Sequence, residues 1–151
     1  MINSCLVCER ISQIKSNKNS NFIFELETSY VVFADSQFYA GYVLLLSKYH
    51  QKELHELTPK IKDNYLKEMS LVAEAIYKVY QPKKLNYELL GNSHSHLHWH
   101  IIPRYKDDLN LTQPIWVIDQ ALRNNKPLST IETEKQIATI RGEIIQLLSK
   151  S

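Results

Sequence analysis

The sequence predicts an α+β fold in which an antiparallel sheet packs against a long helix. Short segments rich in Val, Ile, Phe and Tyr are separated by brief polar turns, as in neighbouring antiparallel strands. Two longer segments instead repeat apolar residues every three or four positions, which is the spacing of an amphipathic helix. The length of 151 residues fits one domain, so we expect both kinds of element to share a single core.

The sheet is expected to contain five strands. The first two segments lie close together and predict a hairpin, and the third is an apolar run typical of a strand buried on both faces. The last segment is expected to stop at Pro103, because proline cannot donate a hydrogen bond to a neighbouring strand. The five segments are residues 21–26, 30–34, 41–47, 85–90 and 94–102.

Three helices are expected. A short one covers residues 4–14, and the longest begins at Thr58-Pro59, where a capping residue precedes a proline in the first turn. Pro82 ends this long helix, and the last helix covers residues 131–148. The apolar stripe along the long helix predicts core packing rather than a ligand surface, and it consists of Ile61, Tyr65, Met69, Val72, Ile76 and Val79.

Composition and charge restrict the partners and the compartment. The net charge of +2 is too small to predict binding to nucleic acid or to an anionic membrane. No apolar run approaches the ~20 residues of a membrane helix, and no secretory signal is visible, so a cytoplasmic location is expected. The two cysteines, Cys5 and Cys8, form one Cys-x-x-Cys pair. In a reducing compartment a structural disulfide is not expected, which leaves metal binding, redox use or simple burial.

Four of the six histidines alternate along the last predicted strand: His94, His96, His98 and His100. Side chains alternate between the faces of a strand, so all four imidazoles are expected on one face, about 6.5–7 Å apart at the backbone. That spacing suits an elongated polar ligand such as a chain of phosphates. Near neutral pH an imidazole can act as nucleophile, proton donor or hydrogen-bond donor. The alternatives are a metal cluster and a fortuitous polar strand edge.

Residues 96–102 read His-Leu-His-Trp-His-Ile-Ile, which resembles the signature of the histidine-triad (HIT) nucleotide-binding superfamily, and in particular its bacterial hydrolases. Pro103-Arg104, which often follows that signature, is also present. Further similarities lie at Gly91-Asn92-Ser93, at Phe33-Ala34-Asp35 and in the segment 41–50. The resemblance covers residues 5–105, so it implies one HIT-like domain over 1–151 with a helical extension over 115–150.

The resemblance implies a nucleotide-conjugate hydrolase or nucleotidyl transferase. His98 would attack the α-phosphate of a dinucleoside polyphosphate or nucleoside phosphoramidate, and water would release the nucleoside monophosphate from the resulting nucleotidyl-histidine. His100 would bind the phosphate, Asn92 and Ser93 would donate hydrogen bonds to it or to the leaving group, and Asp35 would hold the ribose hydroxyls. No catalytic cofactor would be required. The resemblance also implies a homodimer whose sheets continue across the interface.

The sequence departs from the family pattern at three positions. Tyr42 stands where many members have a histidine, and Asn92 replaces the usual, longer Gln. His94 is additional, and it either extends the phosphate site or lies at an exposed strand start. These departures keep open an alternative function, a nucleotide-binding or sensing module with little turnover. Trp116, in the extension, is expected to pack in the core, with stacking on a base or covering the dimer as alternatives.

The resemblance also implies a zinc site. Some bacterial members bind zinc through an N-terminal Cys-x-x-Cys, a histidine upstream of the long helix and the first triad histidine, and all four ligands occur here at matching places. A Cys₂His₂ set suits a closed, tetrahedral structural Zn²⁺. The alternative is a pair of buried, reduced cysteines and an unrelated surface histidine. The four candidate ligands are Cys5, Cys8, His50 and His96.

Overall fold

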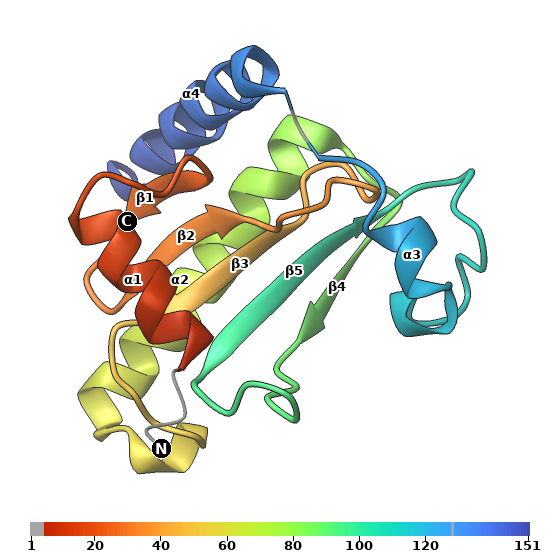
Figure 1. Cartoon of the computed structure of the whole chain (residues 1–151). Helices are drawn as coiled ribbons and strands as arrows, with labels where there is room; N and C mark the ends of the chain where they lie inside the picture. The colour runs from red at the N-terminus through yellow and green to blue at the C-terminus, as the bar shows by residue number, and fades with distance from the viewer. Residues whose placement is uncertain (1–4, 128) are drawn as a thin grey trace.

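The computed structural model describes residues 5–127 and 129–151, and its centre is a five-stranded sheet (Figure 1). The strand order is β1-β2-β3-β5-β4, and every neighbouring pair is antiparallel. The predicted α+β class with an antiparallel sheet is therefore confirmed. The strands are β1 (Phe22–Glu25), β2 (Ser29–Phe33), β3 (Val43–Ser47), β4 (Lys84–Glu88) and β5 (His98–Arg104).

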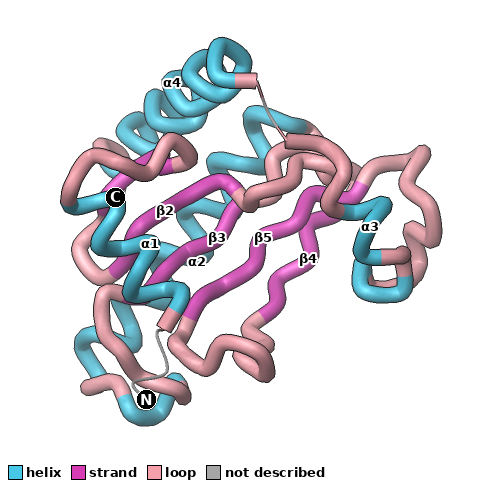
Figure 2. Tube along the Cα trace, in the orientation of Figure 1, coloured by secondary structure: helices cyan, strands magenta, loops and turns pink. Residues whose placement is uncertain are grey.

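Helices cover both faces of the sheet. Helix α1 (Leu6–Lys15) lies on one face, and α2 (Pro59–Tyr80) and α4 (Thr130–Leu148) lie on the other (Figures 1 and 2). Alternation along the strands produces this division: Leu46 of β3 packs with α1, whereas its neighbour Leu45 belongs to the core under α2. Three short elements complete the chain, namely the 3₁₀ turns η1 (Leu54–Glu56) and η2 (Ile115–Val117) and the helix α3 (Gln120–Arg123).

The long helix has the predicted limits. Thr58 occupies the N-cap position and Pro59 the first turn, where a missing N–H breaks no intrahelical bond. At the other end Gln81 adopts a left-handed conformation, with φ of 48°, immediately before Pro82. The residues Tyr65, Val72 and Ile76 are fully buried against the sheet, so this stripe packs in the core as predicted.

The last strand differs from the prediction at both ends. It begins at His98 rather than at residue 94, because β4 ends at Glu88, opposite His100, and β3 ends at Ser47, opposite the residue before His98. Residues 94–97 therefore have no continuous partner strand. At the other end β5 runs past Pro103 to Arg104, since its pairing with β3 stops at Ile101 and the missing N–H interrupts no ladder on that side.

Arg104 attaches the C-terminal extension to the sheet. Its guanidinium is almost fully buried and donates to Asp108, to Asn86 of β4 and to the carbonyls of Asn110 and Gln113. These bonds satisfy a buried cation and fix the path of the chain that leads to η2. The extension is thereby held beside β5. Within residues 5–127 and 129–151, no helix combines the length and apolar character that crossing a membrane requires.

Candidate active site and metal centre

A cavity of about 350 Å³ opens over the α1 face of the sheet. Its floor is formed by β3 and β5, one side by α1, and the other by η2 and α3, which lie on either side of the central strands in Figure 1. Aliphatic and aromatic side chains make up much of the wall, with a few polar groups among them, as in typical small-molecule sites. The polar and charged lining residues include Arg10, Asp35, His94, His98, His100 and Arg123.

His98 and His100 project from β5 onto the floor of this cavity. Their ring centroids are 4.9 Å apart. The His98 Nδ1 lies 2.7 Å from the carbonyl oxygen of His96. A carbonyl can only accept, so Nδ1 carries the proton and Nε2 has a free lone pair. Burial lowers the pKa of His98, which keeps the ring neutral near pH 7. His98 therefore has the protonation state that a nitrogen nucleophile requires.

His100 contacts two side chains outside the triad. The Tyr42 hydroxyl lies 2.5 Å from its Nδ1, and the Trp116 ring lies edge-on to the imidazole with centroids 5.8 Å apart. Burial, aided by the neighbouring His98, lowers the pKa of His100 to about 4. Burial also raises the pKa of Tyr42 well above its usual range. Both groups are therefore neutral at physiological pH.

The structure brings together some of the predicted site residues and separates others. His94, His98, His100 and Asp35 line one cavity, although the exposed Asp35 carboxylate is paired with Arg10 at 2.6 Å. Asn92 and Ser93 lie on the exposed loop before β5, outside the residues that line this cavity. His94 reaches the cavity from that loop rather than from the strand.

The prediction of four imidazoles on one strand face is wrong for His94 and His96, which precede the strand. His96 is not among the residues that line the cavity, and its Nε2 lies 2.8 Å from the Ser47 carbonyl oxygen. Because that carbonyl accepts, Nε2 carries the proton and Nδ1 is free to act as a ligand. Burial lowers the pKa of His96 as well. The histidine row is thus divided between two sites.

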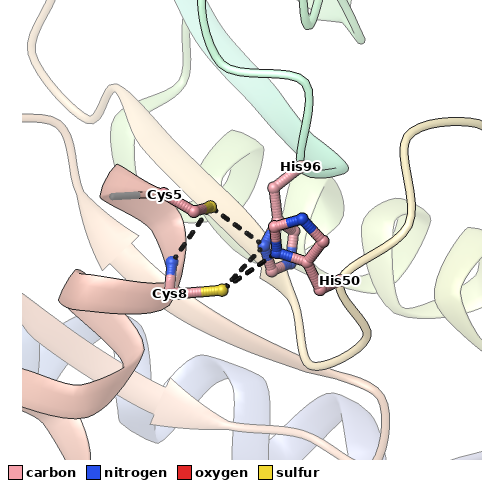
Figure 3. A group of neighbouring side chains, drawn as sticks. All are labelled: Cys5, Cys8, His50 and His96. Atoms are coloured by element: carbon pink, nitrogen blue, oxygen red, sulfur yellow. Dashed lines mark hydrogen bonds between the residues drawn. The ribbon is translucent and has the colours of Figure 1, made fainter. Parts of the chain in front are cut away.

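The second site gathers the four predicted metal ligands (Figure 3). The Cys8 Sγ lies 3.1 Å from His50 Nδ1 and 3.4 Å from His96 Nδ1, and the Cys5 Sγ lies 3.5 Å from the same His96 atom. All four ligand atoms lie within 4.8 Å of one another. Around a tetrahedral Zn²⁺, sulfur and nitrogen ligands are about 3.5 Å apart, given Zn–S of about 2.3 Å and Zn–N of about 2.0 Å. The chemistry and spacing of these donors therefore fit Zn²⁺.

Sequence reasoning did not assign Arg10 or Arg123 to the cavity. It expected Trp116 to pack in the core, and this is wrong, because the side chain is exposed and lines the cavity. Arg10 follows the apolar Leu6 by one helical turn, so its place on the inner face of α1 has a periodic signal in the sequence. Arg123 and Trp116 stack on each other at 4.9 Å at the far wall of the cavity. Their position depends on how Arg104 holds the extension, and no local pattern in the sequence indicates that contact.

Comparison with known proteins identifies the class. The HIT domain family model matches residues 15–107. Over 108 residues the chain is 32% identical to Protein hit of Bacillus subtilis, an alignment covering 68% of this chain and 72% of that protein. The chain therefore belongs to the HIT domain family.

Solved structures share the fold. A histidine triad protein from Bradyrhizobium japonicum superposes with a TM-score of 0.69 at 26% identity, over 88% of this chain and 95% of that one. A zinc-bound histidine triad family protein from Mycobacterium smegmatis gives 0.67 at 18% identity, over 98% of both chains. The diadenosine triphosphate hydrolase of Plasmodium falciparum, in complex with cyclomarin A, gives 0.57 at 17% identity, over 84% of this chain and 78% of that one. At such identities the last two similarities show the fold alone.

Proposed function

We propose that this protein is a nucleotide-conjugate hydrolase or nucleotidyl transferase that uses His98 as its nucleophile. The observation that carries the proposal is the His98 ring, which lines the cavity with Nδ1 bonded to the His96 carbonyl and Nε2 left unprotonated. Membership of the HIT domain family supports a nucleotide substrate, and the Plasmodium relative is a diadenosine triphosphate hydrolase.

The reaction we propose has two displacements. His98 Nε2 attacks the α-phosphorus, a P–N bond forms, and the bond from phosphorus to the leaving group breaks, with the leaving group taking its electron pair and a proton from solvent. Water then attacks the same phosphorus and gives a proton back to solvent, the P–N bond breaks with its electron pair returning to Nε2, and the nucleoside monophosphate leaves. In the transfer reaction another acceptor replaces water. His100 would donate a hydrogen bond to the phosphate oxygens, where negative charge increases in each transition state.

The remaining predicted residues have binding roles in this proposal. Asp35 would accept hydrogen bonds from the ribose hydroxyls, for which its carboxylate must exchange the Arg10 partner seen in the structure. His94 would extend the phosphate site. Asn92 and Ser93 would reach the phosphate or the leaving group by movement of their exposed loop.

The test is product release from a panel that contains a dinucleoside polyphosphate and a nucleoside phosphoramidate. We expect wild type to release nucleoside monophosphate and His98→Ala to lose activity by about a thousandfold or more, because the covalent step disappears. His55→Ala, at an exposed histidine on η1, is the matched control and should retain activity. Equal rates for wild type and His98→Ala would contradict the proposal. Tight nucleotide binding without turnover would instead support the binding-module alternative.

We also propose that Cys5, Cys8, His50 and His96 hold a structural zinc ion. The donor spacing supports this, as does the zinc-bound relative from Mycobacterium smegmatis. Bound zinc would tie the first turn of α1 to the loop that follows β3 and the loop that precedes β5, and would stabilise this end of the sheet. Metal analysis should find about one zinc per chain in wild type and in His55→Ala, and much less in His50→Ala. Equal zinc in His50→Ala and the control would overturn the assignment.

A homodimer is the remaining proposal for a partner. The strand order places β1 and β4 at the two edges of the described sheet, and an unpaired edge can add a strand from a second copy. Light scattering during size-exclusion chromatography should give twice the chain mass, and a monomer at the concentration of the activity assay would contradict it. The cytoplasmic location and the lack of nucleic-acid and membrane partners stay predictions from the sequence.

A further inference from the structure

Tyr42 is held rigidly beside the site. Its backbone N–H donates to the Tyr39 carbonyl at 3.1 Å, and its carbonyl accepts from the Ala34 N–H at 3.0 Å and from the Gln37 amide at 2.8 Å. Gly41 precedes it with φ of 85°, and a Cβ there would lie 2.6 Å from the Tyr80 ring, so the turn requires glycine. The phenol is thereby directed from the start of β3 to the neighbouring strand β5.

The direction of the Tyr42–His100 hydrogen bond follows from the chemistry of the two groups. The 2.5 Å contact joins a phenol oxygen to an imidazole nitrogen, and each of these atoms is able to donate or to accept. A neutral phenol is the better donor and an imidazole nitrogen the better acceptor. The tyrosine O–H therefore donates, His100 Nδ1 accepts, and the proton of the neutral imidazole lies on Nε2.

Trp116 also lies against the His100 ring. Its indole N–H donates to the Glu88 carboxylate at 2.6 Å, and Glu88 lies opposite His100 in the pairing of β4 with β5. The indole and imidazole rings are perpendicular, with their centroids 5.8 Å apart. With Tyr42 at Nδ1 and Trp116 against the ring, His100 is held in one orientation.

We propose that Tyr42 is a positioning residue that fixes His100 in the Nε2-protonated tautomer, so that a neutral His100 donates a hydrogen bond to the phosphate attacked by His98. The two neighbouring imidazoles then carry their protons on opposite nitrogens. His98 presents a lone pair at Nε2, and His100 presents an N–H at the equivalent atom. The phosphate half of this inference rests on the proposed function, whereas the tautomer assignment does not.

The direct test is the ¹⁵N spectrum of the imidazole nitrogens, because protonated and unprotonated ring nitrogens resonate far apart. In wild type we expect a protonated Nε2 for His100 and a protonated Nδ1 for His98. In Tyr42→Phe we expect the His100 signals to move toward an average of the two tautomers, with His98 unchanged. A protonated Nδ1 in wild-type His100, or identical His100 signals in the variant, would overturn the inference.

Kinetics supply the second readout. Tyr42→Phe should lower kcat about tenfold with KM nearly unchanged, since the donor acts most strongly on the transition-state charge. Tyr65→Phe is the matched control: it also removes a buried hydroxyl bonded to β3, at the Leu45 carbonyl, but on the opposite face of the sheet. It should lower stability while leaving kcat and the His100 spectrum unchanged. If Tyr65→Phe lost as much kcat as Tyr42→Phe, the effect of Tyr42 would be structural, and the inference would be overturned.

The two measurements separate this inference from the proposed function. If the expected tautomers are found and His98→Ala keeps full activity, the proposed nucleophile is wrong and the positioning of His100 by Tyr42 stands. If His98→Ala is inactive and Tyr42→Phe alters neither the spectrum nor kcat, the nucleophile stands and this inference fails.

Discussion

Each triad histidine has its proton position assigned by one hydrogen-bond partner. The Ser47 carbonyl holds the Nε2 proton of His96, and the His96 carbonyl holds the Nδ1 proton of His98. The free nitrogen is therefore Nδ1 in His96 and Nε2 in His98, as the proposed metal ligand and the proposed nucleophile require. Alternation in the sequence predicted that these residues act together. It could not predict that His96 and His98 carry their protons on different nitrogens, because the carbonyls that decide the tautomers are placed by the fold.

Acid should destabilise the protein partly through His100. Its pKa is about 4 in the folded chain and about 6.5 in an unfolded one, so between these values the unfolded state binds more protons. The free energy of unfolding should consequently fall as the pH drops from 7 toward 4. Urea titrations of wild type and His100→Gln should show that wild type loses about 2 kcal/mol more between pH 7 and pH 4.5. Parallel losses in the two proteins would contradict this.

Helix α1 connects the two sites. Its N-cap is Cys5, its first turn carries Cys8, and Arg10, two residues after Cys8, lines the cavity. A metal ion that holds the first turn would therefore also hold one wall of the cavity.

Removal of metal should loosen α1 selectively. With a chelator we expect amide hydrogen exchange to accelerate in α1 and in the loop before β5, while the buried part of α2 stays protected by the core. His50→Ala should show the fast exchange without chelator, and His55→Ala should behave as wild type. Unchanged exchange in α1 after chelation would show that the cluster does not stabilise this helix.

At the scale of elements, the limits set by neighbouring residues were predicted well, and the limits set by distant partners were not. The limits of α2 were confirmed because Thr58-Pro59 and Pro82 act on the backbone next to them. The predicted start of β5 was wrong because a strand extends only as far as its partners. The residues of β5 do not indicate that β4 ends at Glu88. The cavity followed the same rule. A local pattern predicted that His98 belongs to the site, whereas the place of Trp116 in the cavity wall depends on distant contacts.

At the scale of the whole molecule, the strand order places the cavity over the middle of the sheet. Strands β3 and β5 form the floor of the cavity, and each of them is hydrogen-bonded to a neighbouring strand on both sides. The floor is therefore rigid. The C-terminal extension then returns over β5 and closes the far wall, with Arg104 as its anchor.

Arg104→Ala should therefore be strongly destabilising. It removes the cation paired with the largely buried Asp108 carboxylate and a donor to each of the Asn110 and Gln113 carbonyls, and we expect the free energy of unfolding to fall by about 3 kcal/mol. Arg141→Ala, which removes a single bond to the Ile23 carbonyl, is the comparison and should cost about 1 kcal/mol. Urea unfolding measures both. Equal, small losses would show that Arg104 does not anchor the extension.

The most direct measurement of the central claim is the mass of the protein after incubation with a nucleotide conjugate and quenching in acid-free denaturant. A nucleophilic His98 predicts a chain heavier by one nucleotidyl group, with the modification located by peptide mapping on His98 and lost in His98→Ala. An adduct on another residue, or turnover by a wild-type enzyme that remains unmodified at every quench time, would contradict the account.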